Sequence, residues 1–75
     1  MTLDQAVLEQ WMAGDQVPGV GFGFYEPVVI TAGPFAGALG AVVALVSLTP
    51  GPLYTVEIGG GRGDVHVLEA DLAEA

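Results

Sequence analysis

His66 is the only histidine of the chain, and Asp64 lies two residues before it in a segment of alternating hydrophobicity. In a β-strand this spacing places both side chains on one face, as a base and a carboxylate that orients it. Catalysis by such a pair also needs an attacking group, and the only serine, Ser47, belongs to a different predicted strand. We therefore interpret His66 as a structural histidine and expect neither catalytic residues nor enzyme activity.

Three acidic residues near the C-terminus offer oxygen ligands for Ca²⁺ or Mg²⁺, but Glu69, Asp71 and Glu74 lack the spacing of an EF-hand loop. The glycine-rich segment 59–63 lacks the lysine and the following helix of a phosphate-binding loop. The overlapping tripeptide Arg62-Gly63-Asp64 is one that some adhesion receptors recognise, and we attribute it to chance. We expect no metal site and no cofactor.

The charge of the chain limits its partners. Nine acidic residues and a single base, Arg62, give a net charge of -8. Because nucleic-acid binding depends on contacts of Lys and Arg with phosphates, we expect no direct binding to DNA or RNA. The same charge repels anionic membranes and favours a basic protein as the partner.

The length and the cysteine content limit the domain organisation. The 75 residues suffice for one small domain, and the chain contains no cysteine for disulfides or thiolate metal sites. Because no basic region precedes an apolar segment at the N-terminus, we expect no signal peptide and a cytoplasmic location. A core of this size stabilises weakly, so binding to a partner or homo-oligomerisation is a reasonable expectation.

Residues 1–14 predict an amphipathic helix. Thr2 and Gln5 fit a capping box, and Gly14 is a natural helix end. Apolar residues recur along one face at helical spacing, namely Leu3, Val7, Leu8, Trp11 and Met12. This face either packs on the chain's own β-domain or docks in a groove of a partner.

Residues 15–26 predict a loop that is rich in glycine and aromatic side chains. Four glycines and Pro18 fall within residues 14–23, which is typical of a loop. Phe22, Phe24 and Tyr25 follow the glycines. These aromatic residues either close a small core or form a binding surface.

The hydrophobic period changes to that of strands at residue 28. Four strands are predicted at 28–31, 39–48, 53–58 and 64–69, followed by a helical turn at 70–72 and a frayed C-terminus. The short connections leave no room for crossover helices, so we expect an antiparallel meander that closes into a small barrel.

A membrane-spanning helix is the alternative for residues 28–48, because these 21 residues carry no charge. Gly33-Pro34 interrupts that segment, and neither flank has the Lys or Arg residues that anchor spanning helices. Valine-rich runs on both sides of a turn favour strands, so we expect no membrane association.

The segment VVITAGPFAGALGAVV, residues 28–43, resembles the KOW motif of NusG-type transcription elongation factors and several ribosomal proteins. The similar features are a valine-rich strand, the turn Gly33-Pro34-Phe35-x-Gly37, and Gly40 before the next strand. With the later strands the resemblance covers residues 27–72. It implies an SH3-like antiparallel barrel of four to five strands over residues 27–75, preceded by one α-helix, with the turn glycines in structural roles and Phe35 folded over the barrel end.

KOW domains are similar in contacting RNA, the ribosome or RNA polymerase, and those that bind nucleic acid usually carry Lys and Arg around the turn. Here these positions hold alanine, at Ala32, Ala36 and Ala38. We therefore predict a non-enzymatic protein-interaction module whose binding surface joins residues 22–25 with the turn at 33–37. The candidate protein-binding residues are Trp11, Phe22, Phe24, Tyr25 and Phe35.

Two alternative functions remain open at this point. The first is a KOW-type protein that joins the transcription or translation machinery through a protein partner. The second is an accessory subunit of an enzyme complex, whose helix docks through Leu3, Val7 and Trp11.

Overall fold

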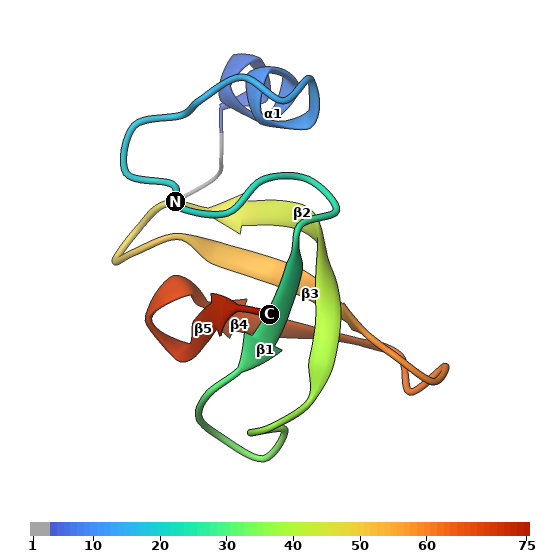
Figure 1. Cartoon of the computed structure of the whole chain (residues 1–75). Helices are drawn as coiled ribbons and strands as arrows, with labels where there is room; N and C mark the ends of the chain where they lie inside the picture. Colours follow the sequence, from blue (N-terminus) through green and yellow to red (C-terminus); the bar gives the residue numbers. More distant parts are fainter. Residues whose placement is uncertain (1–3) are drawn as a thin grey trace.

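The computed structural model describes residues 4–75, which form one antiparallel sheet with a short helix above one end of it (Figure 1). The mainly β fold with one N-terminal helix is thereby confirmed, and the predicted limits of the first four strands agree with it to within one residue. The elements are α1 (Gln5–Met12), β1 (Pro27–Ile30), β2 (Leu39–Ser47), β3 (Leu53–Ile58), β4 (Asp64–Leu68), the 3₁₀-helix η1 (Glu69–Asp71) and β5 (Leu72–Glu74).

The five strands form a sheet of order β4-β3-β2-β1-β5, in which every neighbouring pair is antiparallel. The register between β2 and β3 shifts at two places along β2, between Val42 and Ala44 and between Leu45 and Ser47. These irregularities bend β2, so that its two neighbours, β1 and β3, run in different directions (Figure 1). The predicted closure into a barrel is not observed, because over residues 4–75 the ladder ends at β4 on one side and at β5 on the other.

The C-terminus is ordered as a strand, so the predicted fraying is wrong. Ala73 lies opposite Val29 of β1, and the Thr31 amide donates a hydrogen bond of 2.8 Å to the Asp71 carbonyl. The helical turn lies one residue earlier than predicted, over η1, and it carries the chain from the β4 edge of the sheet to the β1 edge.

Helix α1 begins later than predicted. Asp4 is its N-cap and accepts a hydrogen bond of 2.9 Å from the Ala6 amide, so Gln5 is the first helical residue instead of the third. Thr2, the predicted cap, lies outside the described residues, as does Leu3.

The helix ends where the sequence predicted. Gly14 has φ of 89°, and its amide donates to the Trp11 carbonyl at 3.1 Å. The Asp15 amide donates to the Gln10 carbonyl at 3.0 Å, which completes a Schellman motif.

The buried core joins helix α1 and the loop after it to all five strands of the sheet. Trp11 is 2% exposed and Tyr54 is fully buried. Around them lie aliphatic side chains from three strands, Val28, Ile30, Val42, Val56 and Ile58. The apolar face of α1 therefore packs on the chain's own β-domain.

The uncharged segment 28–48 forms most of β1, a turn and β2, so it is not helical. Among the residues that the structure describes, no helix is long and apolar enough to span a membrane.

Two kinds of constraint explain the glycines around the first turn. Gly33 and Gly37 have φ of 87° and 91°, which residues with a Cβ adopt only with strain. Gly40 instead lies so close to β3 that a Cβ added to it would approach the Glu57 carbonyl oxygen to 2.5 Å.

Candidate protein-binding groove

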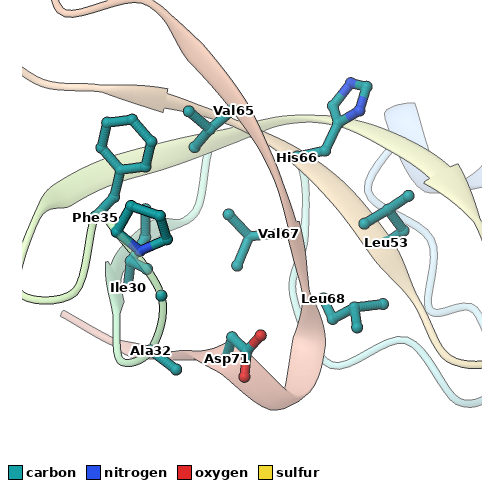
Figure 2. A pocket seen from close by; sticks show the side chains of 11 residues that line it. Ile30, Ala32, Phe35, Leu53, Val65, His66, Val67, Leu68 and Asp71 are labelled. Carbon is teal, nitrogen blue, oxygen red and sulfur yellow. The ribbon is translucent and has the colours of Figure 1, made fainter.

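A hollow of about 310 Å³ lies between β4 and the turn that joins β1 to β2 (Figure 2). We call it the β4 groove. One wall is formed by Ile30 and residues 32–35, and the other by residues 65–68. Leu53 and Asp71 complete the lining.

The pleat of β4 determines which side chains enter the groove from that strand. Val65 and Val67 point toward Phe35, whereas His66 and Leu68 project from the other face of β4 (Figure 2). Because residues 65–68 all line the groove, it follows the outer edge of β4 and extends onto both faces of that strand.

Phe35 stands at the tip of the turn and faces the groove near Val65 (Figure 2). The Gly37 amide donates to the Ile30 carbonyl at 2.7 Å, and the Ala36 amide donates to the Gly33 carbonyl at 3.1 Å, so hydrogen bonds hold the turn. The Phe35 side chain nevertheless remains 41% exposed. It covers one end of the sheet only in part and presents an apolar surface on a well-anchored turn.

Phe22, Phe24 and Tyr25 precede β1, at the end of the sheet where α1 carries Trp11 (Figure 1). The indole Nε1 of Trp11 donates a hydrogen bond of 2.8 Å to the Phe22 carbonyl, and the Trp11 and Phe24 rings meet edge to face at 5.7 Å. Phe22 and Phe24 pack against the core, and only Tyr25, which is 65% exposed, faces away from it. These residues close the core.

Strand β1 lies between residues 22–25 and the turn at 33–37, the two segments of the predicted surface. Trp11 is buried and offers no area to a partner. Of the candidate residues, Phe35 alone contributes to the β4 groove.

A hydrogen-bonded cluster that the sequence did not predict joins the 15–26 loop to β3 and η1. The Tyr54 hydroxyl donates to Glu69 Oε1 at 2.6 Å, and the Gly21 amide donates to the same oxygen at 2.7 Å. The Phe22 amide donates to the Tyr54 hydroxyl at 3.4 Å. No local pattern signals this cluster, because Gly21 and Glu69 are 48 residues apart.

Burial and the hydrogen bond to Glu69 raise the pKa of Tyr54 well above its usual value. The Tyr54 hydroxyl therefore keeps its proton to a higher pH than an exposed tyrosine does. Since Glu69 is the first residue of η1, the cluster fixes the start of the segment that brings Asp71 to the groove.

The residues considered as a base with its carboxylate or as metal ligands lie in β4, η1 and β5. Asp64 and His66 share the exposed face of β4 as predicted, and His66 lies opposite Thr55 of β3. Within residues 4–75 no three His, Cys, Asp or Glu side chains are grouped so that they could hold a metal ion.

The lining of the β4 groove contains one acidic residue and neither Lys nor Arg. That residue is Asp71, while the sole base, Arg62, donates a hydrogen bond of 3.4 Å to the Gly59 carbonyl and lines a separate hollow that Phe35 shares. Glu57 and Asp64 lie directly opposite each other at the start of β4, where two like charges repel and attract a cation.

No family model, curated protein or solved structure matches the chain. Assignment of a function therefore rests on the fold and on the β4 groove.

Proposed function

We propose that the protein is a small non-enzymatic interaction module with an SH3-like fold, which binds a basic protein partner in the β4 groove. The observation that carries the proposal is Phe35, a large apolar side chain left 41% exposed beside a hollow of about 310 Å³. A hydrogen-bonded turn holds it there. Exposed apolar residues that border a hollow of this kind are typical of binding surfaces.

The strand order supports the SH3-like part of the proposal. Strands β1 to β4 pair in sequence as a meander, and η1 returns the chain to place β5 beside β1. The resemblance of residues 28–43 to a KOW motif points to the same kind of domain.

The charge supports the choice of partner. The net charge of -8 and the acidic residue within the groove lining favour Lys or Arg on the ligand. A cytoplasmic location is part of the same proposal, since the chain contains no cysteine.

The alternative of an enzyme's accessory subunit loses one of its docking residues, because Trp11 is buried. Association with the transcription or translation machinery remains compatible with the module, provided that a protein makes the contact. Residue 32, which lines the groove beside the β1–β2 turn, is alanine, so it offers no positive charge for a phosphate of RNA.

The test compares tagged wild-type protein with Phe35→Ala and Leu39→Ala in affinity purification from nuclease-treated lysate of the source organism. Leu39 is the matched control, because it is an exposed apolar residue that does not line the groove. We expect a stoichiometric basic protein to bind wild type and Leu39→Ala and to be lost with Phe35→Ala. Loss of all bound material on nuclease treatment, or equal retention by Phe35→Ala, would contradict the proposal.

A further inference from the structure

Over residues 4–75 no strand pairs with the outer edge of β4, so main-chain groups along that edge have no partner strand. The Ile58 amide donates to the Gly63 carbonyl at 2.9 Å, and the Glu69 amide donates to the Pro52 carbonyl at 2.9 Å. These bonds fix the phase of the β3–β4 ladder, since bonded and non-bonded pairs alternate in an antiparallel pair.

The pairs Val56–Val65 and Tyr54–Val67 are therefore the hydrogen-bonded ones. His66 occupies a non-bonded position between them, so its N–H and C=O point away from β3. The N–H of Leu68 points the same way. This pattern of alternating free donors and acceptors is what an added strand requires.

The β4 groove lies along this same edge. Its lining includes Val65 and Val67 from one face of β4 and His66 and Leu68 from the other (Figure 2). A strand placed beside β4 would direct alternate side chains to these two faces. Residues on one face would contact Phe35 and Val67, and those on the other would contact Leu68.

The net charge of the chain indicates whether the added strand comes from a second copy or from another protein. A second copy would bring a further net charge of -8 to an edge that begins at Asp64 and to a groove that Asp71 lines. A segment with Lys or Arg side chains would instead complement both acidic residues. The edge and the charge together favour an extended basic segment of another protein.

We infer that β4 binds its partner by strand addition, in which an extended basic segment becomes a sixth strand of the five-stranded sheet. Its main chain bonds to His66 and Leu68, an apolar side chain packs against Phe35, and a basic side chain lies near Asp71. This inference rests on the proposed function and specifies the kind of ligand.

Proline at position 66 tests the main-chain contact. Because the His66 N–H points away from β3, His66→Pro removes the free donor and leaves the existing ladder intact. His66→Ala is the matched control, since it removes the imidazole and keeps the N–H. Thermal unfolding of both variants verifies that each retains the fold.

The first probe is a blocked decapeptide of alternating lysine and valine, and the second replaces its lysines with glutamate. We expect the basic peptide to slow hydrogen exchange at the His66 and Leu68 amides, and the acidic peptide not to do so. His66→Pro should weaken binding of the basic peptide about tenfold relative to His66→Ala, because a main-chain acceptor of the peptide is left unpaired.

Equal affinity of the two His66 variants, protection elsewhere than along β4, or absence of binding by the basic peptide would overturn strand addition. Dimerisation of the protein alone that His66→Pro abolishes would replace the partner's segment with a second copy and overturn the choice of occupant. If the purified partner still depends on Phe35 but binds His66→Pro as tightly as His66→Ala, the interaction module stands and strand addition fails.

Discussion

Removal of one hydroxyl, by Tyr54→Phe, should destabilise the protein strongly. The ring of Tyr54 is fully buried and meets Phe22 edge to face at 5.8 Å, a contact that phenylalanine preserves. The hydroxyl donates to the Glu69 carboxylate at 2.6 Å. The substitution therefore removes hydrogen bonds and leaves the packing of the ring unchanged.

The magnitude follows from the partner that is lost. A hydrogen bond to a charged group stabilises a folded protein by about 1.5–3 kcal/mol, and the 3.4 Å bond from the Phe22 amide adds little at that distance. We expect a loss of about 2 kcal/mol in the free energy of unfolding. In a domain of this size that loss lowers the melting temperature by about 8–16 °C.

Thermal and urea unfolding at pH 7, followed by circular dichroism, measure this difference. Tyr25→Phe is the matched control, because Tyr25 is largely exposed and no side-chain hydrogen bond of its hydroxyl exists among the described residues. A change for Tyr54→Phe no larger than that for Tyr25→Phe would refute the role of the Tyr54–Glu69 hydrogen bond.

Three further predictions test the fold. First, the pKa of Tyr54 is raised in the folded protein, so its contribution to stability is fully retained below the ordinary tyrosine pKa of about 10 and should fall above it. In urea unfolding between pH 9 and about pH 11, the free energy of unfolding should therefore fall more steeply with pH for wild type than for Tyr54→Phe. Gly40→Ala should cost about 2 kcal/mol or more in thermal unfolding because of the approach to β3, whereas Gly51→Ala, whose added Cβ meets nothing within 4 Å, should cost less than about 1 kcal/mol. Ala73→Pro should cost about 3 kcal/mol in urea unfolding because it removes a β1–β5 hydrogen bond, and Glu74→Pro should cost less because that N–H points away from β1; equal effects would contradict the assigned ladder.

The strands β1 to β4 were predictable because each has a run of apolar or alternating residues between strong turn signals. Gly33-Pro34 and Pro50-Gly51-Pro52 delimit β2 in the sequence, and the glycines at 59–61 separate β3 from β4. Strand β5 gave no such signal, since three residues are too few to establish a period and its order depends on pairing with β1. The sequence also could not show that the sheet stays open, because closure into a barrel depends on tertiary contacts between its edge strands.

The candidate site was predictable only in part. Phe35 was identified from its place at the tip of a glycine turn, but the groove beside it combines residues 32–35, β4 and η1, which no local pattern relates. The aromatic residues 22–25 showed the opposite problem. Their composition is compatible with both a core and a binding surface, and only the contact of Phe24 with Trp11 distinguishes the two.

Photo-crosslinking from position 35 tests the central claim most directly. The measurement replaces Phe35 with benzoylphenylalanine, irradiates the protein in lysate of the source organism, and identifies crosslinked chains by mass spectrometry; the same replacement of Tyr25 is the control. Both side chains are exposed aromatics, and they lie at opposite ends of β1. The β4 groove predicts a crosslink from position 35 to an extended basic segment of one protein and none from position 25. Crosslinks to that protein from position 25 alone, or to RNA from position 35, would contradict the account.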